Sequence, residues 1–371
     1  MKYVSLETVC NILDSQRVPI TASERAKGEY PYYGANGIQD YVADYIFDDE
    51  LVLLAEDGGN FGSKDRPIAY RVSGKCWVNN HAHVLKPKEC IDVDYLCYSL
   101  MFYDTTGIVN GATRQKLTQA AMRQMTIPMV SMEQQKDIVL KLNKVEDLIL
   151  QRKEQLVKLD ELVKSRFIEM FGDPVRNEKE WSRLTLGDIC EIGSSKRVFE
   201  KDYVPVGIPF FRTKEIVELS KGNKISTELF ITEEHFETLK QAYGVPKKND
   251  LLISAVGTIG TIWIVNGEFE FYFKDGNLIQ IKSSENFNSV FMKYLLDELI
   301  ANYKKEMSTG TAYSALTIAG LKKMLVYDVP LDLQNQFAEF VEQTDKLKFE
   351  VKEALEKLEI LKKSLMQQYF G

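Results

Sequence analysis

Cysteine and histidine are scarce in this sequence, which holds five cysteines and three histidines. The cysteines include no C-x-x-C pair, so their spacing predicts neither a zinc site nor a disulfide framework. His81 and His83 share one face of a strand-like stretch, but no third ligand accompanies them at a suitable spacing. We therefore expect reduced thiols, a cytoplasmic location and no bound metal.

Long apolar runs are also missing. No stretch of 18 apolar residues occurs, and the first residues lack the apolar core of a signal peptide. We therefore expect neither export nor insertion into a membrane. The 371 residues, of which 44% are apolar, suffice for two or three domains with ordinary cores.

An excess of positive charge is absent as well. The formal net charge is -7, and no long segment is basic overall. This composition argues against a protein that coats nucleic acid by bulk electrostatic attraction. Binding to DNA would need local basic patches or a more basic partner, so we expect the isolated chain to bind DNA weakly.

Motifs for nucleotide and cofactor chemistry are missing too. The sequence contains no G-x-x-x-x-G-K-[ST] phosphate loop, no N-P-P-[YF] or D-P-P-[YW] motif and no glycine-rich loop for S-adenosylmethionine after a strand. Glu56 and Asp57 could be catalytic carboxylates, but a polar turn or a contact with the amino group of cytosine is favoured. We predict a protein that is not itself an enzyme.

What the sequence does contain is a stretch that occurs twice. Residues 153–172 and 352–371 are identical at ten of 20 positions without a gap. Each ends a run of about 38 residues with apolar side chains three and four residues apart, which predicts two helices of about 55–60 Å with a coiled-coil seam. Each run closes on Phe-Gly, where glycine suits the left-handed turn that ends a helix.

The predicted seams follow this alternation. The first comprises Ile138, Leu142, Val145, Ile149, Arg152, Leu156, Leu159, Val163, Arg166 and Met170. The second comprises Phe337, Phe340, Thr344, Leu347, Val351, Ala354, Leu358, Leu361, Leu365 and Gln368. Because a long helix with a narrow apolar seam needs a partner, we expect the two helices to pack against each other.

The duplication extends through the whole chain. Equivalent segments are 4–12 and 184–192, 30–38 and 208–216, 49–62 and 250–260, 77–85 and 273–281, 93–101 and 290–299, and 110–125 and 309–324. We predict a mixed α/β (α+β) fold with a pseudo-two-fold internal repeat. Globular domains at 1–130 and 173–330 alternate with long antiparallel helices at 131–172 and 331–371, and residues 172–182 form a flexible linker.

Four motifs in this duplicated order carry a family resemblance. They are PMVSMEQQ at 128–135, the helix end KSRFIEMFG at 164–172, PFFRTKEI at 209–216 and SAVGTIG at 254–260. Together they resemble the specificity subunit of type I restriction-modification systems, over essentially the full length. In the second half, Gln334, Asn335 and Gln336 take the place of Glu133, Gln134 and Gln135.

The resemblance implies two target recognition domains joined by two conserved antiparallel helices. Such subunits recognise a bipartite, asymmetric site on double-stranded DNA. They hold two methyltransferase subunits and, in the full complex, two restriction subunits. S-adenosylmethionine, ATP and magnesium are then expected on those partners, and no cofactor on this chain.

Candidate DNA contacts are polar residues and glycines at equivalent places in the two halves, because arginine can bind guanine, asparagine can bind adenine and a glycine loop can approach a phosphate. An ordinary surface hairpin is the alternative for any one of them. The candidates are Tyr32, Tyr33, Asn36, Gly59, Asn60, Gly62, Asn80, His81, Arg114, Lys116, Arg212, Thr213, Gly257, Thr258, Gly260, Lys274 and Asn277.

Candidate partner contacts are charged residues of the long helices that recur in both copies. They are Lys153, Glu154, Lys158, Lys164, Lys352, Glu353, Lys357 and Lys363. Most such charges simply face solvent, but their repetition favours docking of methyltransferase subunits. The main alternative is a coiled-coil scaffold protein without DNA recognition, which would leave the duplicated polar loops unused.

Overall fold

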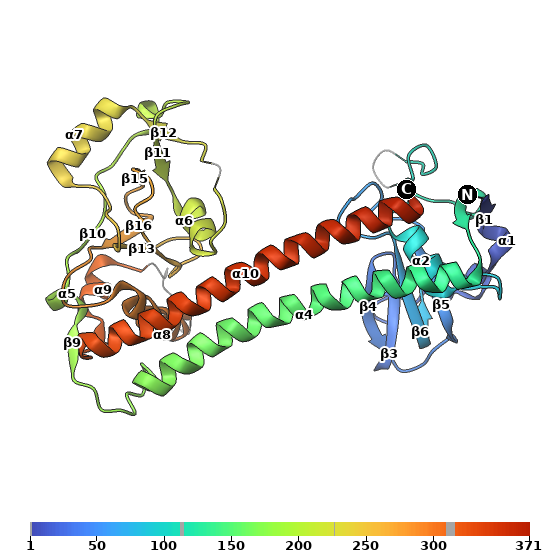
Figure 1. Ribbon diagram of the computed structural model, residues 1–371, viewed down its shortest axis with the longest axis horizontal. Coiled ribbons are helices and arrows are strands. Elements are labelled where there is room, and N and C mark those ends of the chain that lie inside the picture. The colour runs from blue at the N-terminus through green and yellow to red at the C-terminus, as the bar shows by residue number, and fades with distance from the viewer. Residues whose placement is uncertain (1, 112–114, 226, 309–315) are drawn as a thin grey trace. The chain divides into compact units, whose positions relative to one another are not determined.

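The computed structural model describes residues 2–111, 115–225, 227–308 and 316–371. The chain divides into two compact units, each of which combines a globular part with segments of the two longest helices (Figure 1). Unit 1 comprises Met1–Glu154 and Lys352–Gly371, and unit 2 comprises Gln155–Val351. Because the division falls inside both long helices, neither helix belongs to one unit alone.

Unit 1 is built on a six-stranded mixed sheet. Its strand order is β2 (Cys10–Ile12), β7 (Ala82–Pro87), β5 (Phe47–Ala55), β6 (Ala69–Val78), β3 (Lys27–Gly34) and β4 (Gly37–Val42). β3 and β6 run parallel, and the other neighbours are antiparallel. A separate antiparallel pair joins β1 (Lys2–Ser5) to β8 (Thr126–Met129). The shorter helical elements are α1 (Leu6–Val9), the 3₁₀ turn η1 (Asp14–Gln16), α2 (Val93–Met101) and α3 (Gln119–Gln124).

The central strand β5 shows why this sheet is buried on both faces. Leu51 and Leu53 belong to one apolar cluster, and Val52 and Leu54 belong to another. All four are 0% exposed, as expected when successive side chains of a strand point to opposite faces and both faces are covered. Helix α2 packs its buried residues into the second of these clusters.

Unit 2 splits the equivalent sheet in two. One part has the order β10 (Ile192–Gly193), β16 (Leu278–Ile281), β13 (Leu251–Ser254) and β14 (Ile262–Ile264); the other has β12 (Phe230–Ile231), β11 (Ile208–Phe211) and β15 (Tyr272–Phe273). β9 (Arg183–Thr185) pairs with β17 (Leu325–Tyr327). The shorter helical elements are α5 (Leu186–Ile189), the 3₁₀ turn η2 (Glu200–Asp202), α6 (Thr213–Ser220), α7 (Glu233–Tyr243), α8 (Ser289–Ser308) and α9 (Ile318–Lys323).

The two units share one topology. The parallel pairing of Tyr32 with Trp77 in unit 1 recurs as the pairing of Phe210 with Tyr272 in unit 2. β10, β16 and β13 follow the order of β2, β7 and β5, while β14 and β15 together replace the long strand β6. The predicted internal repeat and mixed α/β class are therefore confirmed.

The repeat diverges in its connections. In unit 1 a tight turn joins β3 to β4, whereas in unit 2 helix α6 lies between β11 and β12, and α7 follows β12. The linker at 172–182 is also more ordered than its composition predicts. The indole N–H of Trp181 donates to the Phe171 carbonyl at 2.9 Å, and the Tyr327 hydroxyl donates to the Asp173 carbonyl at 2.6 Å, so both ends of the segment are held within unit 2.

The long helices α4 (Met132–Phe171) and α10 (Leu331–Phe370) contain 40 residues each. In unit 1 the start of α4 packs against the end of α10, where Leu142 shares an apolar cluster with Leu365 and Met366. In unit 2 the end of α4 packs against the start of α10, and the rings of Phe167 and Phe337 lie 5.4 Å apart. The helices are therefore antiparallel in both units, as predicted.

The seam of α4 is as predicted, because none of its ten residues is exposed. The seam of α10 differs. Leu347 and Leu361 are 50% and 44% exposed, Gln368 is exposed too, and Lys348 and Lys362 turn inward instead. A straight helix drifts from an exact 3.5-residue repeat, and a lysine stem can be buried when its ammonium finds a carboxylate.

The ends of the long helices also give one confirmation and one correction. Gly172 adopts a φ of 79°, the left-handed turn predicted after Phe171. Gly371 adopts no such φ, so the same prediction at the end of α10 is wrong. Among the described residues, no helix is both long and apolar enough to cross a membrane.

Candidate nucleic-acid interface

In unit 1 several predicted contact residues meet around the loop that follows β5. The backbone N–H of Glu56 donates to the His81 carbonyl at 2.8 Å, and His81 Nδ1 lies 2.6 Å from Asp57 Oδ1. The side-chain amide of Asn36 donates to the Gly58 carbonyl at 2.9 Å. Lys116 Nζ lies 3.1 Å from Glu56 Oε1. The structure thus brings Asn36, His81 and Lys116 to one loop, from three distant parts of the sequence.

Two glycines shape this loop. A Cβ at Gly59 would lie 2.4 Å from the Cβ of Ala55, so the site has no room for a side chain. Gly62 adopts a φ of 75°, which disfavours other residues. Between these glycines, the side-chain amide of Asn60 donates to the Pro67 carbonyl at 3.4 Å. Asn80 is exposed and lies in the turn between β6 and β7.

The aromatic candidates of unit 1 lie deeper. Tyr32 is 1% exposed, the guanidinium of Arg25 lies 4.2 Å from its ring centre, and its hydroxyl donates to the Ile20 carbonyl at 3.3 Å. Its ring therefore packs inside the unit rather than on its surface. Tyr33 is half-buried and packs on Tyr70, with ring centres 5.7 Å apart. Arg114 lies outside the described residues.

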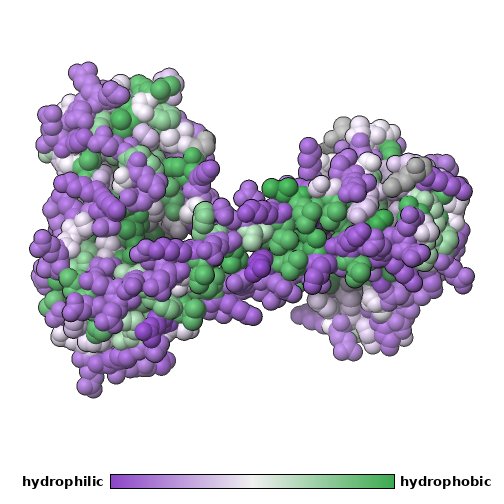
Figure 2. Space-filling view, in the orientation of Figure 1, coloured by the Kyte–Doolittle hydropathy of each residue, from purple (hydrophilic) through white to green (hydrophobic). Residues whose placement is uncertain are grey.

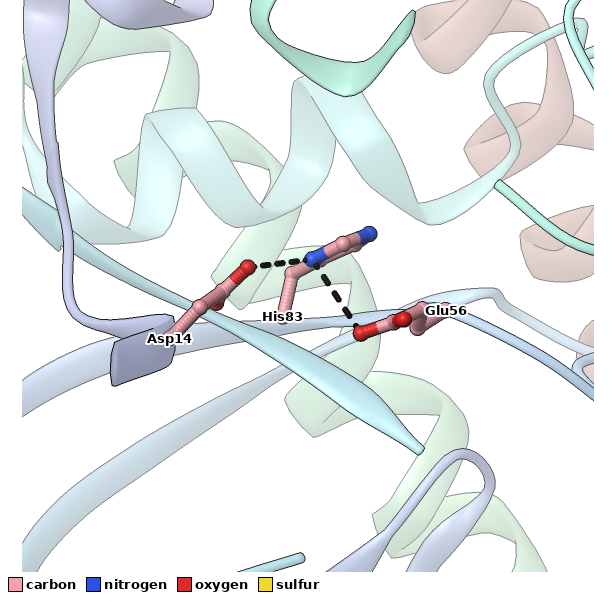
Figure 3. Close-up of side chains that lie close together, drawn as sticks. All are labelled: Asp14, Glu56 and His83. Carbon is pink, nitrogen blue, oxygen red and sulfur yellow. Dashed lines mark hydrogen bonds and ion pairs between the residues drawn. The ribbon is translucent and has the colours of Figure 1, made fainter. Parts of the chain in front are cut away.

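Beneath the loop lies a charged network that sequence reasoning did not group together. Asp14, Glu56 and His83 bring one ligand-type atom each to within 4.8 Å of one another (Figure 3). His83 is 0% exposed, and its Nδ1 lies 2.7 Å from Asp14 and 3.6 Å from Glu56. Arg17 lies 2.7 Å from Glu56 and 3.6 Å from Asp14. Because Arg17 forms ion pairs with both carboxylates, the cluster resembles an ion-pair network more than a typical metal centre.

The network controls the ionisation of Asp14. Burial acts to raise the pKa of this carboxyl, but hydrogen bonds from His83, from the backbone N–H of Val84 and from Gln119 outweigh burial and lower the pKa below its ordinary value. Glu56, which the sequence suggested as a contact with cytosine, instead bonds Arg17 and Lys116. No sequence spacing signals the cluster, because its members come from η1, β7 and the loop after β5.

In unit 2 the residue that follows β11, Arg212, is held by a buried acid. Glu215 is 2% exposed; it accepts the backbone N–H of Arg212 at 2.8 Å and lies 3.2 Å from Arg212 Nη2. Glu228 lies 3.7 Å from the same guanidinium. Thr213 begins α6, and its hydroxyl has no hydrogen-bond partner among the described residues. The buried carboxylate of Glu215 thus fixes the orientation of the Arg212 guanidinium.

The loop after β13 is the counterpart of the loop after β5. The Ala255 N–H donates to the Asn277 carbonyl at 2.8 Å, which repeats the bond from Glu56 to His81. Gly257 and Gly260 adopt φ values of 78° and 84° on either side of Thr258. Lys304 holds the loop by donating to the Ile259 carbonyl at 2.9 Å. These contacts bring Gly257, Thr258, Gly260 and Asn277 together.

Lys274 connects this region to Arg212. Its backbone N–H donates at 2.9 Å to the carbonyl of Phe211, the residue before Arg212. In the turn that carries Lys274 and Asn277, Asp275 forms a 3.0 Å ion pair with Arg197. Sequence reasoning missed Arg197 and Lys304, although both lie beside predicted contacts.

The candidate partner contacts on the long helices all lie at the surface. Lys153, Glu154, Lys158, Lys164, Lys352, Glu353, Lys357 and Lys363 are exposed. Lys153 forms a 3.4 Å ion pair with Glu359 on α10, and Lys363 lies 3.6 Å from Asp65. Large apolar side chains accompany them at equivalent places. Leu150 and Phe349 are 58% and 62% exposed, and Leu162 and Leu361 are 48% and 44% exposed.

These features define a class of protein: a duplicated mixed α/β chain whose two units carry different polar loops on one topology and divide two long helices between them. The sequence pattern of the type I restriction modification DNA specificity domain matches residues 1–159 and 178–361. The chain belongs to this family, whose role is the recognition of DNA sequence.

The similarity to known proteins extends over nearly the whole chain. A Haemophilus influenzae protein, assigned provisionally as a type I restriction enzyme specificity subunit, is 32% identical over 360 residues, covering 96% of this chain and 90% of its own. The type I system S subunit from M. genitalium has a TM-score of 0.60 at 14% identity, covering all of this chain and 96% of its own. A second solved structure, which concerns complex assembly and conformational transition of the type I restriction-modification system, contains a chain with a TM-score of 0.61 at 17% identity. The match covers all of this chain and 97% of that chain. These two structures share the fold.

Proposed function

We propose that this chain reads a bipartite, asymmetric DNA site for a type I restriction-modification complex, one half with each unit. The observation that carries the proposal is a shared topology with different side chains at the loop positions. His81 in unit 1 corresponds to Asn277 in unit 2, and Glu56 corresponds to Ala255. Readers of two different half-sites need such differences, because base edges are distinguished by specific donors and acceptors.

The long helices would set the spacing of the two half-sites. Each has 40 residues, or about 60 Å at 1.5 Å per residue, which is long enough to bridge successive major-groove faces of a duplex, about 34–36 Å apart. Inward-turned lysines support a fixed register. Lys348 pairs with Asp160 at 2.7 Å, and Lys362 pairs with Glu146 at 2.5 Å.

The same helices would dock two methyltransferase subunits. Exposed apolar residues recur at equivalent positions in both helices, Leu150 with Phe349 and Leu162 with Leu361, among the repeated lysines and glutamates. Figure 2 shows such hydrophobic patches along the long helices. A repeated surface suits two copies of one partner. We place S-adenosylmethionine, ATP and magnesium on these partners and on two restriction subunits, and assign this chain no catalytic step in the cytoplasmic complex.

The test is to sequence methylated adenines in cells that express this chain with its methyltransferase. The proposal predicts a motif of two short specified parts separated by a fixed number of unspecified bases. A scaffold without DNA recognition would leave the methylation pattern unchanged when this chain is replaced by another specificity subunit. Binding of the purified complex to duplex DNA should also weaken steeply as salt is raised.

A further inference from the structure

Unit 1 has charged or ionisable side chains at two positions where unit 2 has apolar ones. In the ladder between β5 and β7, His83 lies opposite Leu54, and in the ladder between β13 and β16 the equivalent residue is Ile279, opposite Ile253. Glu56 is likewise replaced by Ala255. Since unit 2 keeps the topology with apolar residues at these places, the fold alone does not require the charged network.

The hydrogen bonds of His83 determine where its protons must be. Its Nε2 lies 2.9 Å from the Leu117 carbonyl, and its Nδ1 lies 2.7 Å from Asp14 Oδ2. A carbonyl oxygen cannot donate a hydrogen bond, and an ionised carboxylate can only accept. A ring with one proton would therefore direct a lone pair at an oxygen atom on one side. Only a ring with a proton on each nitrogen satisfies both contacts.

The charge balance leads to the same state. The side chains of Asp14, Glu56 and Arg17 are 4%, 13% and 13% exposed, whereas that of Lys116 is 50% exposed and reaches solvent. The buried carboxylate of Asp14 and the largely buried carboxylate of Glu56 lie beside the single cation of Arg17 and need one further cation away from solvent, because an unbalanced charge is costly away from water. His83, which is 0% exposed, can supply it.

We propose that His83 is a buried imidazolium that positions the DNA-reading loop of unit 1. It joins Asp14 to the Leu117 carbonyl, and the backbone N–H of Leu117 donates to the Glu56 carbonyl at 2.7 Å. Glu56 precedes Asp57 and Gly58, which bind His81 and Asn36. His83 thereby holds the loop through Leu117 and Glu56, although its own side chain is fully buried and cannot contact DNA. The effect on DNA rests on the function proposed above, whereas the protonation state does not.

The first test is spectroscopic and uses the full chain. In ¹⁵N-edited proton spectra of the imidazole rings at pH 7.5, His83 should show protons on both nitrogens. The variants His83→Gln and His235→Gln identify the signals, because the chain has only three histidines. A ring of His83 with one proton at this pH overturns the proposal.

The second test gives unit 1 the residues of unit 2, through the double variant His83→Ile with Glu56→Ala. This change removes one cation and one anion, so the remaining pair of Asp14 and Arg17 stays balanced. In the methyltransferase complex, methylation of the parent motif should fall about tenfold, with loss of discrimination in the half read by unit 1 only. Unchanged methylation of the parent motif refutes the positioning role. If the parent complex itself methylates no bipartite site, the proposed function fails and the imidazole spectra still decide the state of His83.

Discussion

Gln135 and Gln334 make the same hydrogen bond in the two units. Each side-chain oxygen accepts, at 2.8 Å, the backbone N–H of the residue before a helix, Asp92 before α2 and Asn288 before α8. Each side-chain amide donates to a backbone carbonyl, of Val130 at 3.0 Å and of Val329 at 2.8 Å. The glutamine therefore fastens the first turn of a long helix to the globular part of its own unit.

This relationship corrects the alignment drawn from the sequence, which matched Gln135 with Gln336. Gln334 is 3% exposed and Gln336 is exposed. Gln334→Leu should lower the free energy of unfolding by about 1–3 kcal/mol, because buried backbone groups lose their partners. Gln336→Leu is the matched control and should have little effect. Equal effects of the two substitutions on chemical denaturation would show that the structural equivalence is mistaken.

The charged network makes the stability of unit 1 depend on pH. The folded pKa of Asp14 lies below its ordinary value of 3.8, so its contribution is complete above about pH 4 and is lost as the pH falls through the folded pKa. Asp14→Asn should lose about 2–3 kcal/mol of stability at pH 7 and show a shallower acid dependence. Denaturation measured from pH 7 to pH 2 tests this. A variant whose acid dependence matches that of the parent contradicts it.

The lysines in the seam of α10 should contribute more than surface pairs do. The side chain of Lys348 is 15% exposed, whereas Lys346 and Glu342, which form a 2.8 Å pair, are 70% and 69% exposed. A double-mutant cycle on Lys348 and Asp160 should give a coupling of about 1 kcal/mol, against about 0.3–0.5 kcal/mol for the control pair. If the coupling energy is no larger than that of the control pair, these lysines do not fix the register of α10 against α4.

The docking surface can be tested at its repeated apolar positions. Leu162→Asp and Leu361→Asp should each weaken the binding of one methyltransferase subunit, so that the mass of the assembled complex falls by one subunit. Leu140→Asp is the matched control, because Leu140 is 70% exposed but its counterpart in α10 is Glu339. If the control disrupts assembly as strongly as the other two changes, the repeated residues are not the docking contacts.

The sequence was sufficient to predict the repeat, the two long helices and several of the strands, because these depend on patterns that recur along the chain. The single strand expected at 77–85 is wrong: β6 ends at Val78, His81 lies in a turn, and His83 belongs to β7. The strand expected at 208–216 ends at Phe211, and helix α6 begins at Thr213. Helix α2 at Val93–Met101 coincides with the predicted segment. The spacing of apolar residues could not predict that Lys348 and Lys362 turn inward. A lysine is treated as a surface residue in such a pattern, and its carboxylate partner on the other helix is visible only in the structure. The alignment of the glutamines failed for a related reason: a two-residue ambiguity in a polar stretch is resolved only by burial.

The candidate site was predicted in part. The loops after β5 and β13 were found from glycines and polar residues, and the structure gathers most of the candidates around them. The network of Asp14, Arg17, Glu56 and His83 was not found, because its members are separated in sequence and only the fold brings them together. The bond from Glu215 to Arg212 depends on a helix, α6, that the repeat did not predict.

The most direct measurement exchanges residues 173–330 for the corresponding segment of another specificity subunit and maps the methylated adenines. Because the two units carry different loops on one topology, one half of the bipartite motif should change, while the other half and the spacing stay as they were. A change in both halves, or in neither, would contradict the claim that each unit reads its own half-site.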